Sequence, residues 1–257
     1  MKLSVVSTLY NSEKYIESFI HEVIQVLNDL KDEVTWYEII LVDDGSADNS
    51  LSKAIQLKSN YPHIKIVSLS RNFGHHNAAF CGLSLATGDL IFYIDSDLEV
   101  SPSILKILYY KLKENKDVDV VYCYQSQRQG NWIDEFLGDL FWRLFNLLSK
   151  TNVPKNILSE RLMTRRYVDA LVQIKDVHLF LAGIYSFIGY KQIGIETQRK
   201  RKGETSYSLN KRINLFIDAI TSFSSYPLKV LFYVGSLITL FSIAILFYFA
   251  IRKNPIP

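Results

Sequence analysis

Short apolar runs and longer amphipathic segments alternate along the first 125 residues of the chain. The apolar runs predict strands at residues 2–9, 37–42, 64–69, 90–94 and 119–124. Apolar positions at helical spacing predict a helix after each of the first four strands. The first has its N-cap at Asn11 or Ser12 and ends near residue 30, and the second ends near residue 58. The third and fourth are predicted at 75–86 and 102–113. Strands that alternate with helices favour right-handed crossovers, so we expect an α/β fold with a mainly parallel sheet.

Polar residues follow four of the predicted strands directly, at 8–10, 43–44, 71–72 and 95–97. The carboxyl ends of parallel strands meet at one edge of a sheet, where ligands bind in open α/β folds. Asp95 and Asp97 are two carboxylates one residue apart, and hard oxygen ligands of this kind suit Mg²⁺ or Mn²⁺. An isolated Asp-x-Asp is more often a solvated turn, here with Asp95 or Ser101 capping the next helix. The shared edge favours a metal that bridges to a diphosphate.

The last third of the chain has a different pattern. Residues 230–251 carry no charge and, at about 1.5 Å per residue, can cross a hydrocarbon core of about 30 Å, so we predict a membrane span rather than a buried core helix. Residues 209–223 form an amphipathic pattern that predicts an interfacial helix. Residues 132–148 have a wide apolar face that suits either the core or a bilayer surface. The predicted domains are therefore 1–208, 209–227 and 228–257.

Composition narrows the class of protein. The chain has 257 residues, of which 48% are hydrophobic, enough for one large core. A net charge of +3 is too small to indicate nucleic acid as a partner. Cys81 and Cys123 lie in apolar contexts and are expected to stay reduced, as in a cytosolic domain. The basic run 199–202 is usually a solvated surface, but shortly before a membrane span it favours a lipid or phosphate partner.

Two ordered sets of segments resemble a known family. VSTLYN (6–11), VDDGS (42–46), RNFG (71–74) and DSDL (95–98) resemble family 2 glycosyltransferases of the GT-A fold. Farther on, the chain resembles the branch of dolichol-phosphate mannose synthases and bacterial polyprenyl-phosphate glycosyltransferases, in RLMTRR (161–166), GETSY (203–207) and SFSSYPL (222–228). The resemblance covers nearly the whole chain. It implies a nucleotide-sugar donor, a divalent metal, Mg²⁺ or Mn²⁺, and a lipid acceptor at the membrane.

The resemblance also implies roles for individual residues. The donor-binding candidates are Thr8, Tyr10, Asp43, Asp44, Arg71 and Ser96. Asp95 and Asp97 are expected to hold the metal and diphosphate, with Glu99 as a third metal-ligand candidate where the family often has Gln. Arg128 is expected to act beside Asp95 and Asp97 in catalysis by facing the phosphates. The candidates for acceptor or phosphate binding are Arg199, Lys200, Arg201 and Lys202.

The chain departs from the family pattern at several positions. Family members often have Pro where this chain has Thr8, Arg where it has Gln125, and Asp-Phe where it has Ser159-Glu160. They often have Arg where this chain has Lys200 and Lys where it has Ser206. Members of the branch usually carry two membrane spans, and one is predicted here. These departures leave the exact acceptor and the sugar open.

The expected reaction separates a sugar from a nucleoside diphosphate by single displacement, which inverts the anomeric centre. A polyprenyl phosphate acceptor is anionic near neutral pH and needs little or no general base. A hydroxyl of a lipid-linked O-antigen or capsule glycan is the alternative acceptor, and it needs a carboxylate base. Asp89 and Glu99 are the candidates for that base. His75 and His76 follow Gly74 at a helix start, where contact with a phosphate is one interpretation and a structural or capping role is the favoured one. No His–Cys spacing indicates zinc. A nucleotidyltransferase and a non-enzymatic membrane scaffold are the alternative classes.

The expected location follows from the donor and the span. Nucleotide sugars are cytosolic, and basic residues before the span outnumber Arg252 and Lys253 after it. We therefore expect a protein of the bacterial inner membrane, with a cytoplasmic catalytic domain in contact with membrane lipid. Whether the chain forms a homo-oligomer is left open.

Overall fold

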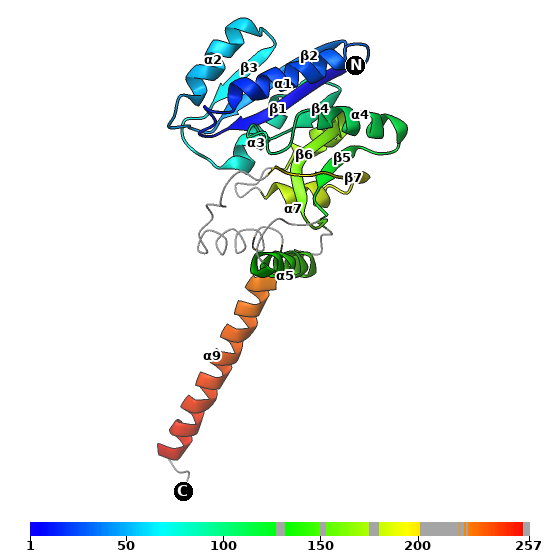
Figure 1. Ribbon diagram of the computed structural model, residues 1–257. Helices are drawn as coiled ribbons and strands as arrows, with labels where there is room; N and C mark the ends of the chain where they lie inside the picture. The colour runs from blue at the N-terminus through cyan, green and yellow to red at the C-terminus, as the bar shows by residue number, and fades with distance from the viewer. Residues whose placement is uncertain are drawn as a thin grey trace.

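The architecture is a mixed sheet with helices on both faces (Figure 1). The computed structural model describes residues 1–126, 132–149, 153–174, 180–200 and 226–253, together with residues 221 and 224. The strands of the sheet are β1 (Lys2–Leu9), β2 (Trp36–Asp43), β3 (Ile64–Ser68), β4 (Leu90–Tyr93), β5 (Val120–Tyr124), β6 (Ile157–Thr164) and β7 (Gln192–Glu196). Their spatial order is β3-β2-β1-β4-β6-β5-β7.

Strand direction confirms the expected mainly parallel sheet. The pairs β1–β2, β1–β4, β2–β3 and β5–β7 are parallel, and β6 is antiparallel to both of its neighbours. The register aligns Leu9 with Asp43 and Val6 with Tyr93. The carboxyl ends of β1, β2 and β4 therefore lie side by side at one edge, where the polar segments emerge.

Two helical layers cover the sheet and create two cores. The helices of the domain are α1 (Ile16–Asp29), α2 (Ser50–Asn60), α3 (His75–Leu85), α4 (Ile104–Glu114), α5 (Trp132–Ser149), α6 (Arg165–Leu171) and α7 (Leu181–Phe187). One core joins the sheet to α1, α2 and α4, and the other joins its opposite face to α3, α6 and α7. The near-continuous apolar strands β1 and β2 follow from burial on both faces.

The predicted start of helix α1 differs from the observed one for a conformational reason. Helix α1 begins at Ile16 rather than near residue 12, because Asn11 adopts a positive φ of 51° and the carbonyl of Ser12 accepts the N–H groups of Tyr15 and Ile16. The chain thus makes an extra turn before the helix. Neither Asn11 nor Ser12 caps it, and this prediction is wrong.

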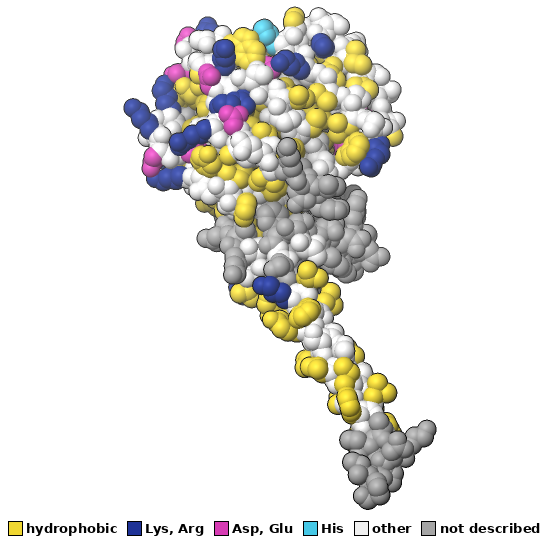
Figure 2. Space-filling view, turned by 180° about the vertical axis from the view of Figure 1, so that it is seen from behind, with side chains coloured by type: hydrophobic (Ala, Val, Ile, Leu, Met, Phe, Trp, Pro, Cys, Tyr) yellow, Lys and Arg dark blue, Asp and Glu magenta, His cyan; other side chains and the backbone are white. Residues whose placement is uncertain are grey.

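The C-terminal helix α9 (Tyr226–Lys253) projects away from the domain (Figure 1). Its segment Leu228–Phe249 has a mean hydropathy of 2.4, and none of it is buried against the rest of the protein. Figure 2 shows hydrophobic side chains along this helix, whereas charged side chains are scattered over the domain. Since nothing in the described chain covers α9, its length and apolar surface suit a membrane span.

Helix α5 combines the two environments that its sequence left open. Phe145 is fully buried and forms a small cluster with Val153 and Phe180. Leu147, two residues farther on, is 75% exposed. One side of α5 thus packs against the domain, and another side is exposed to solvent. The predicted amphipathic helix at 209–223 lies outside the described residues, apart from Thr221.

Candidate active site

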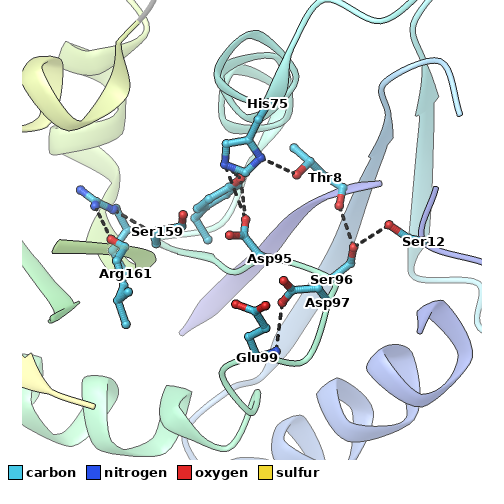
Figure 3. A network of polar contacts seen from close by, with 11 residues as sticks. Thr8, Ser12, His75, Asp95, Ser96, Asp97, Glu99, Ser159 and Arg161 are labelled. Atoms are coloured by element: carbon cyan, nitrogen blue, oxygen red, sulfur yellow. Dashed lines mark hydrogen bonds and ion pairs between the residues drawn. The ribbon is translucent and has the colours of Figure 1, made fainter. Parts of the chain in front are cut away.

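The acidic turn after β4 is the centre of the site (Figure 3). The buried hydroxyl of Ser96 donates to the carbonyl of Thr8 at 2.9 Å and lies 3.2 Å from the hydroxyl of Ser12. These contacts bind the turn to the end of β1. The backbone N–H of Glu99 donates to Asp97 Oδ1 at 3.0 Å, and Leu98 between them adopts a left-handed φ of 60°. The turn is therefore fixed from both sides.

Asp95 and Asp97 carry carboxylate oxygens, the kind of ligand that magnesium and manganese ions prefer. The described part of the chain contains no group of three or more His, Cys, Asp or Glu side chains arranged for a metal. Two carboxylates still fit a hard cation that takes its other ligands from substrate phosphates and water. The carboxylate of Glu99 is paired with Arg199, and Lys200 N–H donates to the Glu99 carbonyl at 2.8 Å. Glu99 thus connects the basic segment to the acidic turn.

His75 lies in the site rather than in a capping position. Its Nδ1 is 3.3 Å from Thr8 Oγ1, and its Nε2 is 3.2 Å from the hydroxyl of Tyr93 and 3.7 Å from Asp95 Oδ1. The N-cap of α3 is Gly74, and no side chain caps this helix. His76 faces the interior against Phe180, and burial lowers its pKa to about 4, so it stays neutral. A role in the interior is thus supported for His76, whereas His75 connects Thr8 to Tyr93 beside the acidic turn.

Asp43 and Asp44 end β2 in different hydrogen-bonding environments. Asp44 accepts the N–H of Phe73 at 2.7 Å and that of Gly74 at 3.0 Å, one on each carboxylate oxygen. Asp43 is 2% exposed; its Oδ2 accepts the N–H of Ser46 at 3.4 Å, and its Oδ1 has no partner among the described residues. Asp44 therefore holds the loop before α3, whereas Asp43 keeps one unused acceptor.

Gly45 allows this loop to pass close to the end of β2. It has a φ of 66°, and a Cβ there would lie 2.7 Å from both the carbonyl carbon of Arg71 and the nitrogen of Asn72. Arg71 stacks on the ring of Phe73 at 4.1 Å. Tyr10, at the end of β1, is 54% exposed. The donor-binding candidates are thus spread along one rim, with Arg71 and Tyr10 at its exposed edge.

Sequence patterns did not single out two buried charged residues of β6. Burial, and next the negative charge of Asp95, raise the pKa of Glu160 to about 8. Arg161 is 1% exposed; it stacks on Tyr185 at 3.4 Å and donates to the carbonyls of Ser159 and Leu158, each at 3.0 Å. Two adjacent charged residues next to the apolar Leu162 and Met163 were the available indication.

The remaining candidates have different outcomes. Arg128, Arg201 and Lys202 lie outside the described residues. Asp89 precedes β4, at the opposite end of the strand from Asp95, and its carboxylate accepts the N–H of Lys2 at 2.8 Å. Asp89 is therefore not placed to act as a base at the acidic turn.

Comparison with known proteins identifies the family. Residues 4–172 match the family model of glycosyl transferase family 2. A Mycobacterium tuberculosis protein described as a glycosyltransferase is 39% identical over 242 residues, which cover 94% of this chain and 70% of the relative.

Two solved structures share the fold. One is S. aureus TarS 1–349 in complex with UDP-GlcNAc, with a TM-score of 0.54 and 19% identity, covering 88% of this chain and 74% of that one. The other is M. tuberculosis glucosyl-3-phosphoglycerate synthase with Mn²⁺, UDP and phosphoglyceric acid, with a TM-score of 0.55 and 21% identity, covering 85% and 76%. The family match, the sequence relative and the shared fold agree, and the chain therefore belongs to glycosyl transferase family 2 and is a glycosyltransferase.

Proposed function

We propose that this glycosyltransferase moves a sugar, with inversion, from a nucleotide-sugar donor to a polyprenyl phosphate in the membrane, for cell-surface glycan synthesis. The observation that carries the proposal is the combination of an acidic turn at the sheet edge with a helix, Leu228–Phe249, that is apolar and unburied. A domain anchored in this way stays beside acceptors that cannot leave the bilayer.

The donor is proposed to lie along the ends of β1, β2 and β4. Oδ1 of Asp43 is a buried acceptor without a partner among the described residues, and a donor N–H of the nucleotide base satisfies it. Thr8, Tyr10, Arg71 and Ser96 line the same rim, with Ser96 acting by holding the turn. Asp44 contributes by fixing the loop that carries Arg71.

The diphosphate is proposed to meet the acidic turn through a divalent cation, Mg²⁺ or Mn²⁺. Asp95 and Asp97 are the residues that would hold it, and the structurally similar M. tuberculosis enzyme was solved with Mn²⁺ and UDP. A cation bound there offsets the negative charge that builds on the leaving diphosphate. Glu99 remains a candidate ligand, although its carboxylate is paired with Arg199.

The chain's own cations are proposed to act on the phosphates. In the reaction, the bond between the anomeric carbon and the diphosphate oxygen breaks, and that carbon bonds to an oxygen of the acceptor phosphate. The diphosphate keeps the electron pair. Arg199 and Lys200 lie against the acidic turn, and Arg128, Arg201 and Lys202 are proposed to add positive charge for the leaving group and the acceptor. The acceptor phosphate is already ionised, so no proton has to be removed from it.

A second acceptor class is favoured by one observation. A hydroxyl of a lipid-linked glycan needs a base, and Glu160 is a buried carboxyl close enough to Asp95 for that charge to help raise its pKa to about 8. A carboxylate tuned toward neutral pH suits proton removal from a hydroxyl. The proposed location is the same for both acceptors: the bacterial inner membrane, with the catalytic domain cytoplasmic.

The test uses membranes that contain the full-length protein. They are incubated with labelled nucleotide sugars and Mn²⁺ or Mg²⁺, and the lipids are extracted and treated with mild acid. Release of a single labelled sugar from the lipid supports polyprenyl phosphate as the acceptor, whereas a labelled oligosaccharide supports the glycan hydroxyl. Asp97→Asn serves as the inactive variant and the exposed Asp32→Asn as its matched control. The absence of any labelled lipid product across the panel contradicts the proposal.

A further inference from the structure

A chain of four polar side chains leads from the end of β1 to the acidic turn (Figure 3). Thr8 Oγ1 lies 3.3 Å from His75 Nδ1, His75 Nε2 lies 3.2 Å from the hydroxyl of Tyr93, and that hydroxyl donates to Asp95 Oδ1 at 3.2 Å. The four residues come from three separate elements, β1, α3 and β4, together with the residues that directly follow β4. The sequence pattern placed Thr8 and Asp95 at one edge of the sheet, but it did not indicate that His75 and Tyr93 connect them.

The donors and acceptors of this chain fit one consistent assignment. The single hydrogen of the Tyr93 hydroxyl is given to Asp95, so its oxygen can accept a hydrogen from His75 Nε2. With Nε2 of His75 as the donor to Tyr93, its Nδ1 forms the remaining contact, with the Thr8 hydroxyl at 3.3 Å.

We propose that Tyr93 and His75 are positioning residues that fix one oxygen of Asp95, so that its other oxygen is oriented toward the metal–diphosphate group. The inference rests on the metal role of Asp95 in the proposed function. Tyr93 is 1% exposed and fully enclosed by the core of α3, α6 and α7, so its hydroxyl has little freedom. His75 is half exposed and is held between Thr8 and Tyr93.

Outer hydrogen-bond partners of this kind orient ligand side chains, and their removal typically weakens metal binding about 10–100-fold. The same site explains why the chain has Thr at position 8. A proline there would have no hydroxyl to meet His75, whereas Thr8 holds the ring by Nδ1. Thr8 thus has a role in the site besides any contact with the donor.

The experiment measures Mn²⁺ binding to the full-length, detergent-solubilised protein in the presence of UDP, by electron paramagnetic resonance of the free ion. Tyr93→Phe is expected to raise the Mn²⁺ dissociation constant roughly 10–100-fold. The matched control is Tyr109→Phe on α4, which removes the hydroxyl of another largely buried tyrosine that donates to a carboxylate, that of Glu33 at 2.7 Å, in the other core. This control is expected to leave Mn²⁺ affinity unchanged. In transfer assays, added Mn²⁺ should restore kcat in Tyr93→Phe, which a general packing defect does not predict.

The role of His75 is tested by a double-mutant cycle. His75→Ala should also weaken Mn²⁺ binding, but it should add nothing in the Tyr93→Phe background, because His75 acts through the Tyr93 hydroxyl. His75→Gln keeps a side-chain N–H and should recover part of the affinity, and the exposed His21→Ala is the control.

Two results overturn the inference while leaving the proposed function intact. One is wild-type Mn²⁺ affinity in Tyr93→Phe. The other is a set of independent, multiplying effects of His75→Ala and Tyr93→Phe, which would mean that His75 acts on Asp95 directly across 3.7 Å. A wild-type protein that binds no Mn²⁺ with UDP overturns both the inference and the proposed metal.

Discussion

Asp43 and Asp44 are adjacent residues of the same type, yet we expect their changes to Asn to have different effects. Asp44→Asn should lower stability, and Asp43→Asn should weaken nucleotide binding. Asp44 accepts two backbone N–H groups, from Phe73 and Gly74. Asn keeps one acceptor and turns an NH₂ group toward the second N–H, so one charge-assisted bond is lost and two donors face each other. A hydrogen bond to a charged group contributes about 1.5–3 kcal/mol. We therefore expect Asp44→Asn to lower the free energy of unfolding by about 2–4 kcal/mol.

Asp43→Asn should leave the fold nearly unchanged, because only the 3.4 Å contact with Ser46 is weakened. Asp43→Asn is instead expected to weaken nucleotide binding, since the unpartnered Oδ1 is the proposed acceptor for an N–H of the nucleotide base. Losing one charge-assisted bond of about 1.5–3 kcal/mol corresponds to a roughly 10–150-fold weaker affinity.

The assays are thermal unfolding of the detergent-solubilised protein, followed by tryptophan fluorescence, and calorimetry with UDP and Mn²⁺. A loss of 2–4 kcal/mol corresponds to a Tm lower by roughly 4–16 °C for a chain of this size. The exposed Asp32→Asn is the control for both assays. The reasoning is refuted if Asp44→Asn melts like wild type, or if Asp43→Asn binds UDP normally.

Three further outcomes are expected. Asp97→Asn should abolish transfer at saturating Mn²⁺ with an unchanged Tm; near-normal activity would remove Asp97 from the metal site. Glu160 keeps its proton in the folded state up to about pH 8, whereas its unfolded carboxyl releases it above 4.5, so the free energy of unfolding should fall as pH rises between these values. Without divalent metal, the Tm of Glu160→Gln relative to wild type should therefore increase from pH 4.5 to 8, and a pH-independent difference would contradict this. Truncation before Leu228 should release protein from membranes in fractionation at high salt; complete retention would mean that α9 is not the main anchor.

Much of the N-terminal half follows from local pattern. The strands β1 to β5 lie within one or two residues of the predicted positions. The largely buried strands β1, β2 and β4 carry near-continuous apolar runs, and the more exposed β3 and β5 keep β-branched residues. Their parallel direction follows from the helices between them, and it brings Thr8, Asp43 and Asp95 to one edge. The acidic turn could therefore be located at this edge from the sequence alone.

The second half depends on contacts that a pattern of apolar residues does not contain. Strand β6 includes Ser159, Glu160 and Arg161, polar residues that an apolar pattern does not mark as a strand. Arg161 pairs with Tyr93 of β4 and stacks on Tyr185, contacts that only the fold provides. Strand β7 is a short, half-exposed edge strand. His75 resembles an ordinary helix-start residue until the fold brings Thr8 and Tyr93 to its two nitrogens.

The left-handed Leu98 makes the acidic turn sensitive to heat. A non-glycine residue in this conformation costs about 1–2 kcal/mol. Leu98 remains there because its side chain packs against the core under α1 and α4, while Asp97 accepts the N–H of Glu99. We expect heating to loosen this packing before the sheet unfolds, which removes the contact that holds Leu98 in the left-handed conformation. The temperature optimum of transfer is thus expected well below the melting temperature. Activity should be lost first by a reversible change of conformation in residues 95–98, and only later by unfolding.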